Sequence, residues 1–240
     1  MVSKPIAYSI GKEAFEGVLI FDDSVKTPRP GLLLVPNWLG VTPANLKQAE
    51  MIAGSRYVIF VADVYGKTAR PKNQEEAGKI SGQLKNDRKT LRERAAKSLE
   101  VLKAQAKTAP LDVTKLGAIG FCFGGTTAIE LARAGAKIGG VAAFHAGLDS
   151  PTPADGKNIS AKILALHGAD DPYNPAKDLE AFENEMRSNK VDWQLVKYGG
   201  AVHSFTDVDA HKAGEADYNE KVAKRAYESM NTFFAELFAG

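Results

Sequence analysis

The only cysteine of the chain, Cys122, lies in the segment 115–131, KLGAIGFCFGGTTAIEL. An apolar run precedes it, glycines flank it, and a helix-like stretch follows, which predicts a strand, a sharp turn and a helix. At such a turn the side chain stands clear of the sheet, at a helix N-terminus that favours thiolate over thiol. An isolated cysteine is more often a small buried hydrophobe, but this context predicts a nucleophile.

A thiol nucleophile needs a base, and the base needs a partner that holds its tautomer. Asp170 and Asp171 follow the apolar run 163–166, and His203 follows the run 193–197 after two glycines. Sites in parallel sheets form beyond the carboxyl ends of the strands, so we expect these side chains at one edge. The order cysteine, aspartate, histidine is that of the α/β-hydrolases, and it predicts a Cys-His-Asp triad.

Eight short β-rich runs alternate with helical segments and must position these residues. This alternation predicts an α/β-hydrolase fold with a mostly parallel, eight-stranded sheet flanked by helices. The first two runs, joined through Gly11 and Lys12, predict an antiparallel hairpin at one edge. The expected strands are 6–9, 15–21, 32–35, 57–62, 116–119, 141–144, 163–166 and 193–197, and the expected helices are 91–106, 126–134, 176–187 and 222–238.

The stretch 66–94 is polar and rich in charge, and its apolar patterning is weak. It predicts an exposed helical insertion in a single domain that spans residues 1–240. Two readings stay open for it: a solvated helical face, or a partial lid over the mouth of the active site.

Composition limits the partners of the protein. The chain has 31 Lys+Arg and 29 Asp+Glu, a net charge of +2 that does not indicate a nucleic-acid or membrane surface. It has one cysteine and no apolar run approaching the roughly 20 residues that span a bilayer. We therefore expect a cytoplasmic protein with a small-molecule partner, and the sequence leaves its oligomeric state open.

Together these segments resemble the dienelactone hydrolase (carboxymethylenebutenolidase) family. The likeness spans nearly the whole chain. The shared motifs are the G-x-C-x-G-G turn at 120–125, the H-G-x-x-D turn at 167–171 with the later Pro175, the H-S-F at 203–205, the early strand and loop 34–43, and the D-x-Y-G stretch 63–66.

The resemblance implies a hydrolase of ester or lactone bonds that needs no cofactor or metal and forms an acyl-thioenzyme. It selects Asp171 as the triad aspartate. It also places the backbone N–H groups of Trp38 and Phe123 in the oxyanion hole. We expect Tyr173 and Phe205 to line the substrate pocket.

Two positions depart from the family pattern. Asn37 stands where dienelactone hydrolases carry a glutamate that keeps the resting thiol protonated, and Asp207 stands where they carry an arginine that holds the substrate carboxylate. An amide cannot act as that switch, and an aspartate repels a carboxylate. We therefore expect Asn37 in a pocket not built for dienelactone, and a Cys122–His203 pair that rests partly as thiolate and imidazolium.

Other functions remain open from sequence alone. An accessible acidic thiol could sense oxidants, although the chain has no resolving cysteine. The two departures also allow a hydrolase-like binding protein with an inactive triad. His203, Asp207 and His211 have the i, i+4 spacing of metal ligands on a helix, but the segment is expected to be a loop. His145 and His167 end apolar strands, where we expect structural hydrogen bonds.

Overall fold

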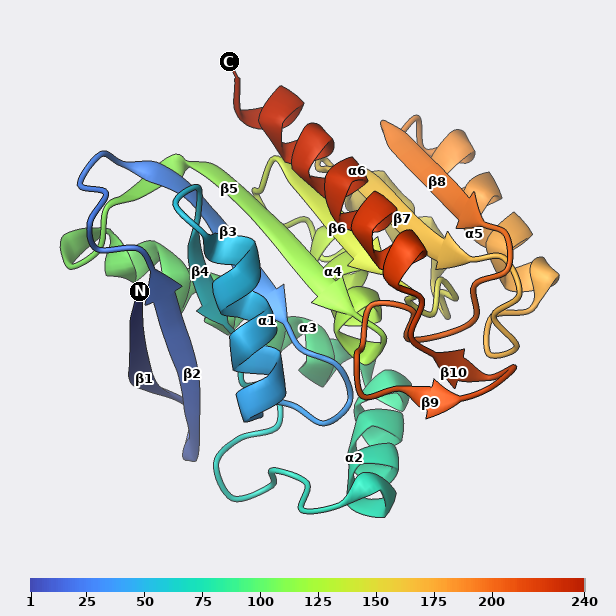
Figure 1. Cartoon of the computed structure of the whole chain (residues 1–240), viewed down its shortest axis with the longest axis horizontal. Helices are drawn as coiled ribbons and strands as arrows, with labels where there is room; N and C mark the ends of the chain where they lie inside the picture. The colour runs from blue at the N-terminus through green and yellow to red at the C-terminus, as the bar shows by residue number, and fades with distance from the viewer. Residues whose placement is uncertain (240) are drawn as a thin grey trace. The chain divides into compact units, whose positions relative to one another are not determined.

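The computed structural model describes residues 1–239. Its eight long strands follow the order β1-β2-β4-β3-β5-β6-β7-β8 in one sheet (Figure 1). The chain divides into two compact units, the first covering Met1–Ile119 and the second beginning at Gly120. Among the described residues, no helix combines the length and apolar character that crossing a bilayer requires.

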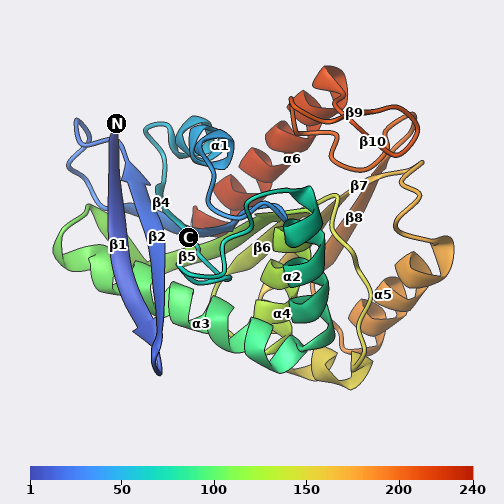
Figure 2. The ribbon, with the colours of Figure 1, turned by 90° about the horizontal axis from the view of Figure 1, so that it is seen from below.

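The first unit holds the N-terminal strands and three helices. Strands β1 and β2 pair antiparallel, β2 and β4 pair antiparallel, and β3 and β4 pair parallel. Helices α1 and α3 lie on opposite sides of these strands (Figure 2). The elements are β1 (Val2–Ile10), β2 (Glu13–Phe21), β3 (Arg29–Val35), α1 (Pro43–Ala53), β4 (Val58–Val61), α2 (Gln74–Asn86), α3 (Arg88–Ala104), the 3₁₀ turn η1 (Gln105–Lys107) and β5 (Leu111–Phe121), whose last two residues lie in the second unit.

The second unit follows the βα pattern of a parallel sheet. Strand β6 pairs parallel with β7, and β7 pairs parallel with β8. Helix α6 lies on one side of these strands, and α4 and α5 lie on the other (Figure 2). The elements are α4 (Phe123–Arg133), β6 (Gly140–Phe144), the 3₁₀ turn η2 (Pro153–Asn158), β7 (Lys162–Gly168), α5 (Ala176–Ser188), β8 (Trp193–Tyr198), β9 (His211–Lys212), β10 (Ala216–Asp217) and α6 (Glu220–Phe238).

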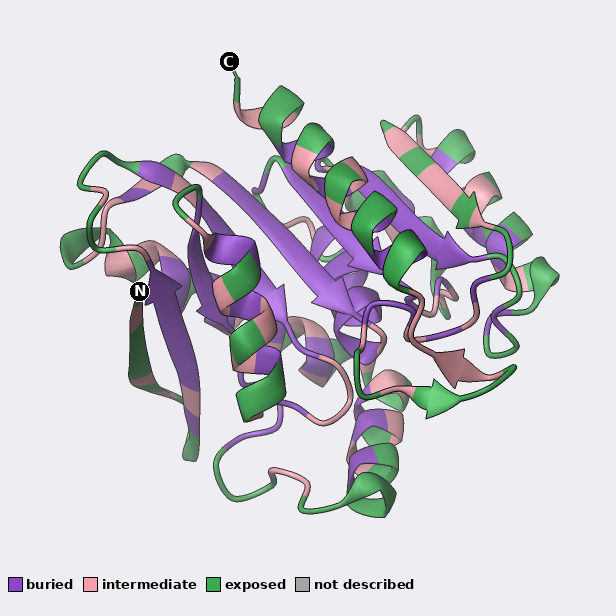
Figure 3. Cartoon of the chain, viewed as in Figure 1, coloured by how far each residue is buried: buried purple, intermediate pink, exposed green. Residues whose placement is uncertain are grey.

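The predicted sheet is confirmed. Every expected strand is present, and the N-terminal hairpin turns at Gly11 and Lys12 with Ile10 opposite Glu13. Gly11 has a φ of 56°, a left-handed conformation that glycine adopts without strain. Strands β4, β6 and β7 are buried almost throughout (Figure 3). In β1 and β8, which lie at the ends of the strand order, exposed residues are interspersed with partly buried ones.

The helix after Cys122 is buried along its whole length, because small residues let it approach the sheet closely. A Cβ added to Gly120 would collide with the backbone of Gly124, and one added to Gly125 would lie 2.7 Å from the Cβ of Ala146. Helix α4 therefore depends on these glycines to start directly after the strand.

Three features differ from the sequence-based expectation. Helix α1 was not expected, although Thr42 caps it and Pro43 begins it. The two short strands β9 and β10 lie in a segment expected to be a loop. The polar stretch 66–94 holds one whole helix, α2, and the first part of a second, α3. Asp87 separates the two helices, because it ends α2 and its side chain accepts the N–H of Thr90 at the start of α3.

A buried ionic cluster connects α4 with α5. The guanidinium of Arg133 bonds Glu185 at 2.6 and 2.9 Å and Glu130 at 2.8 Å, and it also donates to the carbonyl oxygens of Leu148 and Asp149. All three charged side chains are buried. Burial alone would lower the pKa of Arg133, but the two glutamates outweigh it and raise that pKa. The cluster therefore anchors α4, the helix that follows Cys122, to α5.

Removal of one partner should destabilise the protein strongly. We expect Glu185→Ala to lower the free energy of unfolding by about 3–5 kcal/mol, since it leaves the Arg133 cation without its main partner. Glu183→Ala is the matched control on the same helix, because Glu183 is 30% exposed and its ion pairs with Arg187 and Lys197 are 3.6 and 3.7 Å long. Its loss should cost about 1 kcal/mol or less. Urea unfolding measures both, and equal losses would contradict a structural role for the cluster.

Candidate active site

Cys122 occupies the turn between β5 and α4 in a strained conformation. Its φ and ψ are 54° and −119°, values that cost a non-glycine residue about 1–3 kcal/mol. The carbonyl oxygen of Phe144 accepts its N–H at 3.0 Å, and its own carbonyl accepts the N–H groups of Gly125 and Thr126. The strained turn therefore fixes the direction in which the thiol points.

His203 lies after β8 and is held by the small hairpin that follows it. Its N–H donates to the carbonyl of Glu215 at 3.1 Å, and its carbonyl accepts the N–H of Asp217 at 3.0 Å. It also forms an isolated β-bridge with Ala216. The hairpin of β9 and β10, which sequence reasoning missed, thus fixes the backbone of the predicted base.

The structure brings the three predicted triad residues together. The Nε2 atom of His203 lies 3.0 Å from the Sγ atom of Cys122, and its Nδ1 atom lies 2.8 Å from Oδ2 of Asp171. Asp171 also accepts hydrogen bonds from the N–H of Tyr173 and the side-chain amide of Asn174, each at 2.8 Å. Asn174 is a supporting residue that sequence reasoning missed. Its place three residues after the aspartate was the available signal.

The electrostatics of the group favour a charged histidine. Burial lowers the pKa of His203, but the hydrogen bonds and negative charges of Asp171 and Cys122 outweigh burial and raise it to about 10. For Asp171, burial raises the pKa, and the hydrogen bonds and charge of His203 together with the other donors reverse this effect and lower it. The arrangement thus favours an imidazolium that lies between the sulfur of Cys122 and an ionised Asp171.

Tyr173 and Phe205 differ in their exposure. Tyr173 is 53% exposed, its ring meets that of His203 edge-on with centroids 5.2 Å apart, and its hydroxyl donates to Glu215 at 2.8 Å. Phe205 is fully buried and packs edge-on against His145. Tyr173 is therefore placed to contact a molecule that approaches His203.

Of the two strand-end histidines, only His145 has both ring nitrogens hydrogen-bonded. Its Nδ1 accepts the N–H of Cys122, and its Nε2 contacts the hydroxyl of Thr206. The Nδ1 atom of His167 has no hydrogen-bond partner among the described residues. Burial lowers the pKa of His167, so the ring tolerates this position in its neutral form.

Asn37 and Trp38 belong to the first unit, in a tight turn before α1. The carbonyl of Asn37 accepts the N–H of Gly40 at 3.0 Å, and its side chain accepts from the N–H of Leu39 and the amide of Asn45. The carbonyl of Trp38 accepts the hydroxyl of Tyr65 at 2.8 Å. The N–H of Trp38 shares a peptide group with the carbonyl of Asn37, so the bond from Gly40 to that carbonyl also orients the N–H of Trp38.

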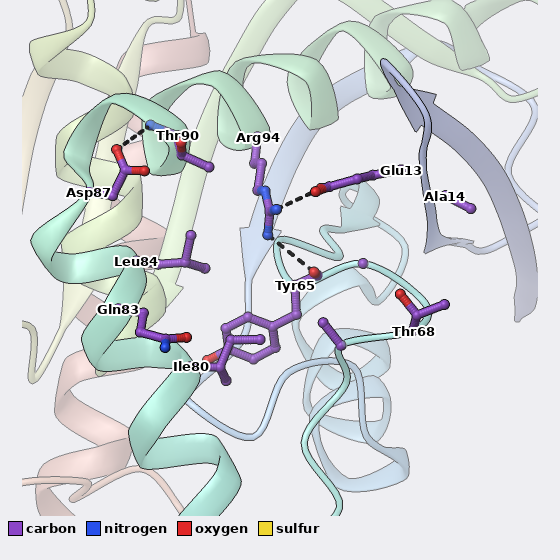
Figure 4. A pocket seen from close by; sticks show the side chains of 12 residues that line it. Glu13, Ala14, Tyr65, Thr68, Ile80, Gln83, Leu84, Asp87, Thr90 and Arg94 are labelled. Atoms are coloured by element: carbon purple, nitrogen blue, oxygen red, sulfur yellow. Dashed lines mark hydrogen bonds and ion pairs between the residues drawn. The ribbon is translucent and has the colours of Figure 1, made fainter.

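A pocket of about 360 Å³ lies in the first unit, lined in part by the polar stretch 66–94 (Figure 4). Arg94 crosses it and bonds the carboxylate of Glu13 and the carbonyl of Tyr65. None of the predicted site residues of the described chain lines this pocket. Within residues 1–239, no cluster of three or more His, Cys, Asp or Glu side chains could hold a metal ion.

Comparisons with known proteins agree on one family. The sequence model of the dienelactone hydrolase family matches residues 15–238. A putative carboxymethylenebutenolidase of Aquifex aeolicus is 26% identical over 88% of this chain and 90% of its own. A solved structure named m3DLH is 36% identical with a TM-score of 0.92, over 99% of this chain and 98% of that one.

A second solved structure, described as a dienelactone hydrolase-like promiscuous phosphotriesterase from metagenomic libraries, is also similar. It is 33% identical, with a TM-score of 0.92 over 98% of both chains. The matching family model extends over most of both units and includes every predicted site residue. The chain therefore belongs to the dienelactone hydrolase family and is an ester and lactone hydrolase of that family.

Proposed function

We propose that Cys122, His203 and Asp171 form a catalytic triad that hydrolyses esters or lactones of small molecules through an acyl-thioenzyme. The observation that carries this proposal is the continuous chain of contacts, 3.0 Å from Sγ to Nε2 and 2.8 Å from Nδ1 to Oδ2. Both distances allow proton transfer without rearrangement. No other group need be added to the reaction besides water.

In the first half of the cycle, the thiolate of Cys122 attacks the carbonyl carbon of the substrate. A C–S bond forms, and the ester C–O bond breaks as the imidazolium of His203 gives its proton to the departing oxygen. In the second half, the now neutral His203 takes a proton from water, and the resulting hydroxide attacks the thioester. The acid is released, and the thiolate and imidazolium are restored.

The negative oxygen of each tetrahedral intermediate needs donors, and we propose the N–H groups of Phe123 and Trp38. Phe123 is the first residue of α4, and the N-terminus of a helix attracts negative charge. The peptide that carries the N–H of Trp38 is oriented by the bond from Gly40 to the carbonyl of Asn37. The N–H of Phe123 therefore lies on the backbone of a helix, and that of Trp38 lies on a peptide that a backbone hydrogen bond holds in place.

We propose neutral esters and lactones, and not dienelactone, as the substrates. The side chain of Asn37 is an amide and carries no charge, and Asp207 would repel a substrate carboxylate. Tyr173 would contact the substrate beside His203, with Phe205 supporting the site from within. The net charge of +2 and single cysteine favour a cytoplasmic enzyme of small molecules that binds neither nucleic acid nor membranes.

A second candidate activity is the cleavage of neutral phosphotriesters. It is favoured by the 33% identical solved structure, which is described as a promiscuous phosphotriesterase and aligns over 98% of both chains. The same thiolate would form an S–P bond while the P–O bond to the aryl group breaks and the imidazolium of His203 protonates the departing oxygen. Neutral His203 would then take a proton from water, and the hydroxide would release the phosphodiester and restore the thiolate.

Loss of the thiol should remove the activity. We expect Cys122→Ala to abolish turnover of p-nitrophenyl acetate, and Cys122→Ser to lose most of it because serine depends more on the base. Intact-mass measurement should show an acetyl adduct on the wild-type protein and none on Cys122→Ala. The same variants assayed with a neutral aryl phosphotriester test the second activity. Turnover that persists in Cys122→Ala would contradict the proposed nucleophile.

The protonation of His203 gives a second prediction. We expect its ring to stay protonated through neutral pH and to release its proton near pH 10, as the raised pKa indicates. Asp171→Asn removes a negative charge from Nδ1, so it should lower the midpoint and reduce kcat by about 10²–10⁴-fold. Nitrogen-15 NMR of labelled histidine measures the midpoint. Asp170→Asn is the matched control, because the Asp170 carboxylate bonds the N–H of Gly200 instead.

The charge of Asp207 provides a prediction about specificity. Asp207→Asn should raise kcat/KM for an anionic ester by about three- to tenfold relative to its neutral analogue, since one repulsive charge is removed. A paired panel of succinyl and butyryl p-nitrophenyl esters measures this ratio. Asp209→Asn serves as the neighbouring control. An unchanged ratio in Asp207→Asn would show that the substrate carboxylate does not approach this position.

A further inference from the structure

Strained backbone is concentrated at three places in the second unit. Cys122, His145 and Ser204 have positive φ values of 54°, 38° and 56°, and Lys190 is the only other non-glycine residue of the described chain with one. Cys122 follows β5, His145 follows β6, and Ser204 follows His203. Such conformations persist only where surrounding contacts impose them, so these segments must be held by specific bonds.

His145 supplies bonds to two of these segments. Its Nδ1 atom accepts the N–H of Cys122 at 3.2 Å, a hydrogen that the carbonyl of Phe144 also accepts at 3.0 Å. Its Nε2 atom lies 2.8 Å from Oγ1 of Thr206, three residues after His203. A single flat ring thus spans the distance between the nucleophile turn and the loop that carries the base.

The contacts determine the state of the ring. His145 is 1% exposed, and burial, followed by the charge on His203, lowers its pKa well below 6.5. A neutral imidazole has one donor and one acceptor, so an Nδ1 that accepts from Cys122 requires a proton on Nε2, which donates to Thr206. The charged or titratable groups that act on it are His203 and His167.

Packing keeps the ring in this orientation. Phe205 meets it edge-on with centroids 5.1 Å apart, Phe121 lies tilted at 6.1 Å, and the ring of His203 lies edge-on at 5.3 Å. The ring cannot rotate without losing these contacts. The bond between His145 and Thr206 is therefore rigid enough to transmit position from one loop to the other.

We infer that His145 and Thr206 are positioning residues, which hold the turn of Cys122 and the loop of His203 at the separation that the Sγ–Nε2 contact requires. The inference rests on the proposed triad for its effect on turnover. Its effect on the thiolate–imidazolium pair is independent of any substrate. A shift of the two loops would lengthen the 3.0 Å contact and weaken the mutual stabilisation of the two charges.

The test compares Thr206→Val, which keeps the shape but removes the hydroxyl, with Thr206→Ser, which keeps the hydroxyl. We expect Thr206→Val to lower kcat for p-nitrophenyl acetate about tenfold with KM changed less than twofold, since small displacements of catalytic groups reduce rate strongly. The pH midpoint of iodoacetamide alkylation of the protein should rise by about one unit. Thr206→Ser should restore both measurements to near the wild-type values.

A second pair of variants tests the histidine. In His145→Asn the side-chain oxygen can replace Nδ1 as acceptor for Cys122 but cannot reach Thr206, so it should behave like Thr206→Val. The double variant His145→Asn/Thr206→Val should show the same kcat and alkylation midpoint as either single variant, because all three proteins lack the bond between residues 145 and 206. Additive losses in the double variant would overturn the inference.

The outcomes separate the inference from the proposed function. A Thr206→Val protein with a lower Tm but with the wild-type kcat and alkylation profile would overturn the positioning role. A loss of kcat without a change in alkylation, or an equal loss in Thr206→Ser, would also overturn it. The absence of Cys122-dependent turnover in the wild-type protein would contradict the proposed function alone, and alkylation would still decide the role of His145 and Thr206.

Discussion

The left-handed backbone of Cys122 is the constraint on which the rest of the site depends. A residue with φ of 54° between β5 and α4 reverses the chain so sharply that a Cβ has no room at Gly120 or Gly125. The strain is offset by the burial of all of α4 and by the buried ion pairs of Arg133 at its far end. The turn of Cys122 is thus held by contacts that extend to the far end of α4.

The same packing that fixes the thiol also creates an electrostatic difficulty. An imidazolium in a largely buried position loses hydration, which by itself would leave His203 neutral. Asp171 supplies the opposing charge, and it is kept ionised by His203 and by donors from Tyr173 and Asn174. The charges of His203 and Asp171 therefore stabilise each other, and the Sγ atom of Cys122 lies on the other side of the His203 ring.

Sequence patterns predicted the sheet well because buried parallel strands have continuous apolar runs, and every such run became a strand. Helix α1 escaped prediction because its buried residues are few, and they include the polar Asn45. The two-residue strands β9 and β10 are too short for any periodic signal. For the site, spacing alone could not separate Asp170 from Asp171. In the structure, the exposed carboxylate of Asp170 bonds a backbone N–H, and the buried one of Asp171 bonds His203.

The two neighbouring histidines show why spacing alone has this limit. His145 and His203 have ring centroids 5.3 Å apart and similar burial, yet their pKa values move in opposite directions. His203 has a carboxylate on one nitrogen and a thiol on the other, so its charge is favoured. His145 has a backbone N–H on one nitrogen and a hydroxyl on the other, so charge gains nothing there and burial decides. The difference between the two histidines comes from partners that lie 23 to 81 residues away in the sequence, which no local pattern specifies.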